Sequence, residues 1–179
     1  MEAEDRAVEE LAAVEENGEV EEEVAANLLD QLRAERKESM EDVSTFIQVP
    51  GYEQIPMFVQ YKMMDGHDIE RISRKVARQT RDRWNRALMV AIDVMIAAAT
   101  GVYVEYGGEM KPLTYNRQPI TGYTPELAQC LDFKAETARE VVIGTFQNKD
   151  LHITNHSMRL QRWFGDTSAN LDEEWLGES

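Results

Sequence analysis

Negative charge is concentrated at one end of this chain of 179 residues, and this limits which part can build a core. Residues 1–42 contain 16 acidic and 4 basic residues, a net charge of −12, whereas residues 43–179 contain 18 acidic and 15 basic residues, a net charge of −3. Acidic runs such as residues 21–23 repel one another and leave little apolar surface to bury. We therefore expect a solvating acidic arm over residues 1–42, disordered or partly helical, and one compact domain over residues 43–179.

The overall charge and the termini argue against several classes of protein. A net charge of −15 opposes binding of the whole protein to nucleic acid or to an anionic membrane, because phosphates attract basic surfaces. The chain begins with acidic residues, where a secretory signal would be basic and then apolar. The longest apolar stretch, residues 87–100, is interrupted by Asp93 and is shorter than the roughly 20 residues of a bilayer span. Cys130 is the single cysteine, which fits a reducing cytoplasm and a buried thiol.

Alternating apolar residues predict strands in three places. Residues 45–49 read as a strand closed by a Pro-Gly turn, and residues 55–63 read as a second strand with one apolar and one mixed face. The short link between them suits an antiparallel hairpin, which must pack on helices to be stable. A further short strand is expected at residues 102–106.

Helical spacing dominates the remainder of the domain. Residues 69–100 contain neither proline nor glycine, so we expect one long helix or two abutting helices, with Asp65 as the N-cap. Shorter helices are expected over residues 125–133, 135–146, 150–165 and 166–175, the third ending at Gly165. The predicted fold class is therefore mainly α within α+β: a helical domain with a small N-terminal antiparallel β-hairpin.

Few residues carry the pattern of an enzyme or a metal site. His152 and His156 are four residues apart on a predicted helix, but no third ligand accompanies them, so surface or polar packing is favoured over metal binding. Asp93 is alone in an apolar helix, where pairing with an arginine or a place at a surface seam is favoured over a functional acid. We expect a protein that is not an enzyme, with no catalytic residue, no metal and no cofactor.

Two features indicate a surface for binding. The first half of the segment 69–100 is basic along one helical face, which fits a solvated face with internal ion pairs, the acidic arm folding over it, a protein partner or, least of all, nucleic acid. The chain also has nine methionines, which fill cores or line adaptable apolar surfaces. The candidate partner-binding residues are Met57, Phe58, Tyr61, Met63, Met64, Arg71, Arg74 and Arg78.

The order of several segments resembles a known protein family. The segments are 47–52 (IQVPGY) with 57–62 (MFVQYK), 68–72 (DIERI) and 160–168 (LQRWFGDTS). Together they resemble the tail assembly chaperones of long-tailed, siphovirus-type phages that infect actinobacteria, and the resemblance covers about residues 43–179. It implies a non-enzymatic protein that binds the tape measure protein and keeps it soluble while the tail tube polymerises around it.

The resemblance also sets expectations about location and partners. It implies a protein of the host bacterial cytoplasm that is absent from the mature virion, and it leaves contacts with the tail tube protein and self-association open. A head-to-tail connector or another structural virion protein is the main alternative. A small metal-dependent hydrolase that uses His152 and His156 is the remote one.

Overall fold

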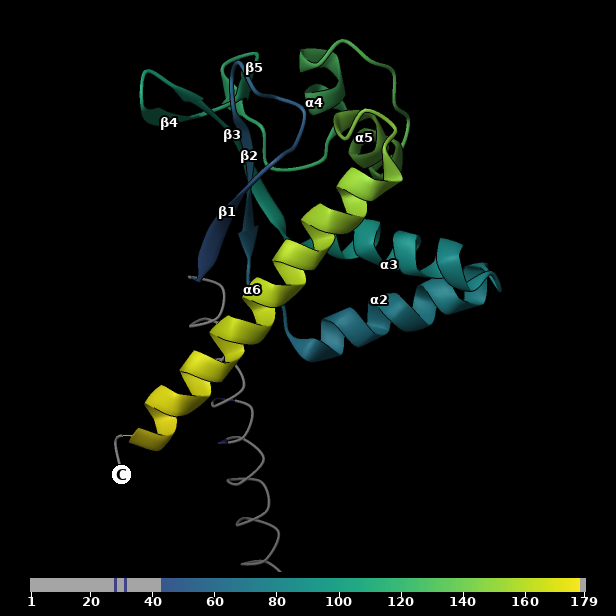
Figure 1. The fold of residues 1–179 in the computed structure, drawn as a ribbon, viewed down its shortest axis with the longest axis vertical. Helices are drawn as coiled ribbons and strands as arrows, with labels where there is room; N and C mark the ends of the chain where they lie inside the picture. Colours follow the sequence, from purple (N-terminus) through teal and green to yellow (C-terminus); the bar gives the residue numbers. More distant parts are fainter. Residues whose placement is uncertain (1–27, 29–30, 32–42, 178–179) are drawn as a thin grey trace, which may run out of the picture. The chain divides into compact units, whose positions relative to one another are not determined.

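The computed structural model describes Leu28, Gln31 and residues 43–177, with side chains up to residue 169. The predicted arm, residues 1–42, therefore lies almost entirely outside the described residues. Within the described domain, a four-stranded antiparallel sheet has the order β1-β2-β3-β4 (Figure 1). Its strands are β1 (Ser44–Gln48), β2 (Met57–Lys62), β3 (Ala99–Tyr106) and β4 (Glu109–Pro112). A small two-stranded sheet pairs β5 (Thr114–Tyr115) with β6 (Gln118–Pro119).

The hairpin, the third strand and the α+β fold class are confirmed, and the sheet is larger than the predicted hairpin. The predicted hairpin is β1 paired with β2, and the strand expected at residues 102–106 is β3, which pairs with the other edge of β2. β4 was not predicted, because all four of its side chains are exposed and it lacks an apolar alternation. The described domain is thus an α+β fold with more helix than strand, in which the predicted hairpin is part of a four-stranded sheet.

Two abutting helices form the segment that follows the hairpin. They are α2 (Gly66–Gln79) and α3 (Arg83–Ala98), which pack against each other. The Asp65 side chain accepts a hydrogen bond from the backbone N–H of His67, which confirms the predicted cap. The second of the two predicted alternatives is therefore observed. Asp82 caps the start of α3, because its carboxylate accepts from the backbone N–H groups of Trp84 and Asn85.

Three helices follow the small sheet, and a capping box marks the start of the second. They are α4 (Pro125–Cys130), α5 (Ala138–Thr145) and α6 (Asp150–Gly177). α5 starts with a capping box, in which the Thr137 hydroxyl accepts from the Glu140 N–H and the Glu140 carboxylate accepts from the Thr137 N–H. The prediction that a helix ends at Gly165 is wrong, because α6 continues through it. Buried Leu160 and Phe164 anchor the preceding turn, and one helical glycine costs only about 1 kcal/mol.

The core lies between one face of the sheet and the helices α3 and α6. Alternate residues of β2 (Met57, Val59 and Tyr61) are buried on this face, as is Val102 of β3. They meet a buried stripe on α3 that includes Met95 and Ala98, while α6 crosses the same face (Figure 1). None of the described helices is long and apolar enough to cross a membrane.

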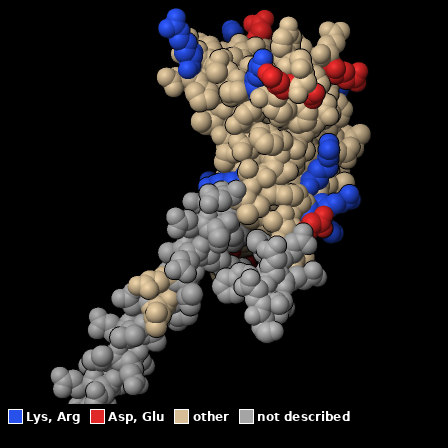
Figure 2. All heavy atoms as spheres, turned by 90° about the vertical axis from the view of Figure 1, so that its left-hand side faces the viewer, with Lys and Arg blue, Asp and Glu red and all other residues tan. Residues whose placement is uncertain are grey.

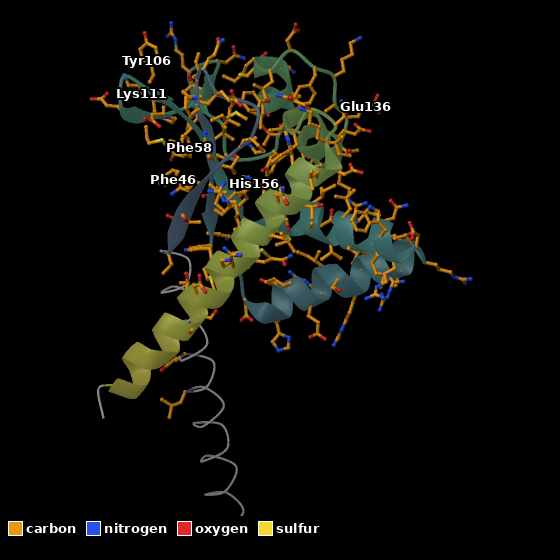
Figure 3. All side chains as sticks on the ribbon, in the orientation of Figure 1. Phe46, Phe58, Tyr106, Lys111, Glu136 and His156 are labelled. Atoms are coloured by element: carbon orange, nitrogen blue, oxygen red, sulfur yellow. The ribbon has the colours of Figure 1, made fainter. Side chains whose placement is uncertain are left out.

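The other face of the sheet carries Phe46 and Phe58, on the side away from α3. Figure 2 views the domain from this side, and over the described surface most charged side chains lie toward the margins. Figure 3 shows Phe46 and Phe58 there, with His156 on the opposite side, between the sheet and α6. The sheet therefore separates a packed core from a second, aromatic surface.

Candidate functional site

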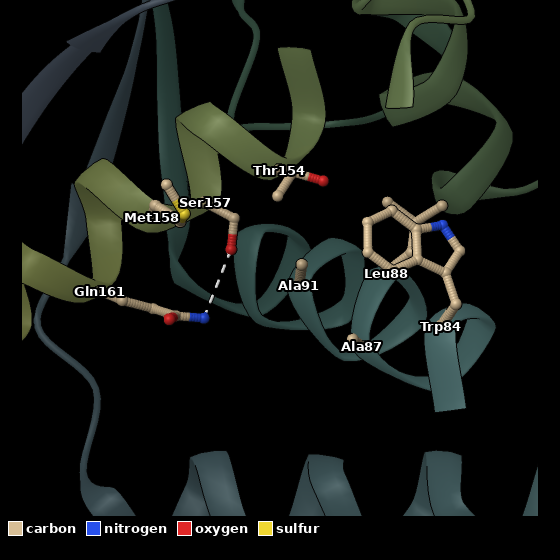
Figure 4. Close-up of a pocket in the computed structure, with 8 residues that line it drawn as sticks. All are labelled: Trp84, Ala87, Leu88, Ala91, Thr154, Ser157, Met158 and Gln161. Carbon is tan, nitrogen blue, oxygen red and sulfur yellow. Dashed lines mark hydrogen bonds between the residues drawn. The ribbon is translucent and has the colours of Figure 1, made fainter. Parts of the chain in front are cut away.

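An apolar groove lies where α3 and α6 cross. It has a volume of about 190 Å³, and helical spacing on both sides builds it (Figure 4). Its residues are Trp84, Ala87, Leu88 and Ala91 of α3 with Thr154, Ser157, Met158 and Gln161 of α6. Residues three and four apart share a helix face, so each helix contributes one wall.

Large apolar side chains at this groove are exposed. Trp84 is 68% exposed and Met158 is 55% exposed, whereas Ala91 and Ser157 in the floor are buried. Leu151, which is 69% exposed, extends the line of Thr154 and Met158 by one turn of α6. Fully burying a side chain of this kind contributes about 1.5–3 kcal/mol, part of which these three still forgo, so the cluster is the candidate interaction surface.

The size of the groove indicates what it can hold. Pockets for small molecules usually have volumes of about 300–1,000 Å³, which this groove does not reach. A volume of about 190 Å³ instead suits one or two anchoring side chains of a protein partner. In the floor, the Gln161 amide donates to the Ser157 hydroxyl at 3.5 Å, so a polar pair faces the apolar walls.

The predicted basic face is exposed on α2. Arg71 pairs with Asp68 at 2.9 Å and Arg74 pairs with Glu70 at 2.6 Å, each within the helix. Arg78 is also exposed. These pairs match the interpretation of a solvated face with internal ion pairs, and such exposed pairs stabilise a helix by only about 0.3–0.5 kcal/mol each. Since α2 packs on α3, this basic face belongs to the same helical layer as the groove wall.

Four of the candidate binding residues lie in the core instead of on a surface. Met57, Tyr61, Met63 and Met64 are all buried, so they stabilise the domain and present no surface to a partner while it stays folded. Phe58 is half-buried on the outer face of the sheet. The alternation in residues 55–63 correctly predicted an apolar face of a strand, but the helices that cover that face come from distant sequence.

Part of the α3 wall of the groove follows a spacing that can be read from the sequence alone. Trp84, Leu88, Ala91, Met95 and Ala98 have the spacing of a packed helix seam. The structure buries the C-terminal part of this seam and leaves Trp84 in solvent. The spacing itself does not distinguish the two parts, because burial along α3 depends on the segments that pack against it, which are α2, α5, α6 and β2.

His156 belongs to a buried polar network that links three parts of the domain. Its Nδ1 lies 3.2 Å from the Gln48 carbonyl oxygen and its Nε2 lies 2.8 Å from the Tyr61 hydroxyl, which also bonds the Tyr123 hydroxyl. A carbonyl accepts, so Nδ1 carries the proton, Nε2 accepts from Tyr61, and Tyr61 accepts from Tyr123. Burial lowers the pKa of His156 to about 4, and burial raises the pKa of both tyrosines.

The two histidines differ in their surroundings. Both ring nitrogens of His156 have partners, so its role is polar packing, as the sequence favoured over metal binding. His152 lies one turn earlier, and its buried Nδ1 has no partner among the described residues. The described part of the chain contains no group of three or more His, Cys, Asp or Glu residues that could hold a metal ion.

Two further predictions are resolved. Asp93 accepts two hydrogen bonds from Arg139, each at 2.6 Å, which confirms that it pairs with an arginine and identifies α5 as the source. The hydrogen bond to Asp93 raises the pKa of Arg139. The prediction of a buried thiol is wrong, because Cys130 is exposed at the last position of the short helix α4.

Comparison of the chain with models of protein families, with curated proteins and with solved structures finds no match in any of the three.

Proposed function

We propose that this chain is a protein-binding tail assembly chaperone that holds an apolar helical segment of the tape measure protein in the α3–α6 groove. It acts by binding, without a catalytic step, in the host cytoplasm. The observation that carries the proposal is the exposure of Trp84 and Met158 across a groove too small for most small-molecule ligands.

The geometry of the groove favours a helix as the bound segment. Its two walls are helices, and a third helix can present side chains at every third and fourth residue to such a groove. Trp84 supplies a large anchoring surface, while Met158 can repack around different apolar side chains. A partner with many similar apolar turns, such as a long tape measure helix, would find several segments that fit.

The net charge of the chain supports a chaperone role over that of a permanent structural component. The chain has a net charge of −15, which keeps a complex with an apolar partner soluble by mutual repulsion. Arg71, Arg74 and Arg78 are exposed on α2, which packs against the groove helix α3, and they would suit acidic residues on the polar side of a bound helix.

Co-expression with segments of the tape measure protein tests the proposal. We expect the wild-type chain to keep these segments soluble, and Trp84→Lys to lose this effect because it places a charge in the groove. Tyr106→Lys is the matched control, since Tyr106 is 67% exposed but lies at the end of β3, away from the groove. Equal solubility with both variants would count against the groove as the binding site.

Mass spectrometry of purified virions separates the chaperone from a head-to-tail connector. A chaperone leaves the assembled tail, so its peptides should be absent or far below those of the tail tube protein. Peptides at a fixed stoichiometry to known virion proteins would favour the connector.

A further inference from the structure

The outward face of the sheet forms an apolar surface separate from the groove. In the strand register Phe46 pairs with Gln60 and Phe58 pairs with Tyr103, so the three aromatic side chains come from three adjacent strands. Phe46 is 45% exposed. By alternation with the core-facing residues, the outward side chains are Ser44, Phe46, Gln48, Phe58, Gln60, Lys62, Tyr103, Glu105, Met110 and Pro112.

The rings on this face are held in place. A side chain at Gly101 would put its Cβ 2.7 Å from the Tyr103 ring, so that ring occupies the space beside the glycine. The Phe46 ring meets the Tyr103 ring edge-on, with 5.0 Å between centroids. The Tyr103 hydroxyl donates to the Gln60 amide oxygen, and the Gln60 amide donates to the Ser44 hydroxyl, both at 3.1 Å. The surface is therefore preorganised, and binding a partner would cost little conformational entropy of these side chains.

The charges on this face are few and lie at its two ends. Of the outward side chains, only Lys62 and Glu105 are charged. Lys62 ends β2 beside the start of β3, whereas Glu105 lies near the other end, one residue beyond the pair formed by Met57 and Val104. Figure 2 shows the uncharged middle of this side of the described surface.

We propose that this face binds a second copy of the chain, sheet against sheet. The two-fold axis would lie midway between the two sheets, parallel to their planes and perpendicular to the strands. This rotation reverses the strand direction, so that Lys62 of each copy lies over the Glu105 end of the other. The same operation stacks the Phe46, Phe58 and Tyr103 surfaces at the sheet-to-sheet distance of about 10 Å. The strand face is thus self-complementary in charge. Nucleic acid, which also stacks on exposed aromatic rings, is disfavoured by the net charge of −15.

The area of the face indicates how stable such a dimer can be. Four strands spaced by about 4.8 Å and rising about 3.3 Å per residue give a face of roughly 400 Å² per copy. The pair would bury roughly 800 Å² in total, below the roughly 1,200 Å² of a standard stable interface. We therefore expect a weak, concentration-dependent dimer with a dissociation constant in the micromolar range or above.

Sedimentation of the full chain over a wide concentration range tests this proposal. We expect the wild type to pass from monomer to dimer, and Phe46→Lys to raise the dissociation constant at least about tenfold, because two lysines would face each other near the axis. Trp84→Lys should dimerise like the wild type, since it changes only the groove. Wild type that stays monomeric up to near-millimolar concentration, or Phe46→Lys that dimerises normally, would overturn the proposal.

A charge exchange gives a second, independent readout. Glu105→Lys should weaken the dimer by placing like charges opposite each other, and the double variant Glu105→Lys with Lys62→Glu should restore it. Circular dichroism verifies that each variant is folded. Failure of the double variant to recover self-association, with the fold intact, would contradict the two-fold arrangement. Loss of the dimer with retained binding of tape measure segments would leave the chaperone proposal standing.

Discussion

Gly144 and Gly165 are both inside helices, and their surroundings differ. A Cβ at Gly144 would lie 2.3 Å from a ring carbon of Phe133, whereas a Cβ at Gly165 would have nothing within 4 Å. We predict that Gly144→Ala lowers the free energy of unfolding by about 1–3 kcal/mol through overpacking. Gly165→Ala should raise it by up to about 1 kcal/mol through helix propensity. Urea denaturation of the two variants measures both changes, and equal effects would show that the Phe133 contact is not tight.

His156 makes the stability of the domain depend on pH. Its pKa is about 4 in the folded chain and about 6.5 when unfolded, so the unfolded state binds the proton more strongly. Stability from this group is present above about pH 6.5 and is lost as the pH falls toward 4. We predict a loss of about 2 kcal/mol between about pH 7 and about pH 5.

Urea unfolding at the two pH values measures this loss, with His156→Gln as the control. The glutamine variant keeps polar atoms at the site but does not titrate in this range. It should be less stable than the wild type near pH 7 and should show a much smaller change toward pH 5. If the wild type and the variant lose stability equally, His156 is not the group responsible.

At the scale of elements, the Asp93–Arg139 pair connects α3 to α5. The Asp93 side chain is largely buried, and Arg139 also donates to Gln79 of α2 at 3.1 Å. We predict that Arg139→Ala lowers the free energy of unfolding by about 1–3 kcal/mol, because it leaves a partly buried carboxylate unpaired. Arg71→Ala, which removes an exposed pair on α2, should change it by less than about 0.5 kcal/mol. Thermal or urea unfolding distinguishes them, and a similar small effect of both would rule out a connecting role.

Local signals in the sequence predicted most of the elements. Asp65 marked the start of α2, and Pro125 after Thr124 marked the start of α4, because caps and N-terminal prolines act within one turn. The alternation of residues 55–63 predicted β2 and its buried face. Such signals depend on neighbouring residues alone, which is why they can be recognised without the fold.

Features decided by distant contacts could not be predicted in the same way. β4 is held by pairing with β3, although its own side chains are exposed. α6 passes Gly165 because Leu160 and Phe164 are already packed. Likewise, Met57 is buried and Trp84 is exposed because of how distant elements pack around them, which local spacing does not specify.

At the scale of the whole described domain, the sheet separates two surfaces for which we propose different roles. The α3–α6 groove carries Trp84 and Met158 on the helical side, and Phe46 with Phe58 lies on the other side of the sheet. Because no residue is shared, a substitution in one surface should leave the other unchanged. If both proposals hold, the chain would bind its partner and a second copy at once, which would raise the effective affinity along a long partner with repeated segments.

Direct binding of a labelled tape measure segment, followed by fluorescence anisotropy, tests the central proposal most directly. We predict that wild type and Tyr106→Lys bind the segment alike, and that Trp84→Lys binds it at least about tenfold more weakly, as expected for an interface anchor. Binding by Trp84→Lys as tight as that of Tyr106→Lys, or no binding by the wild type, would contradict the assignment of the groove as the partner site.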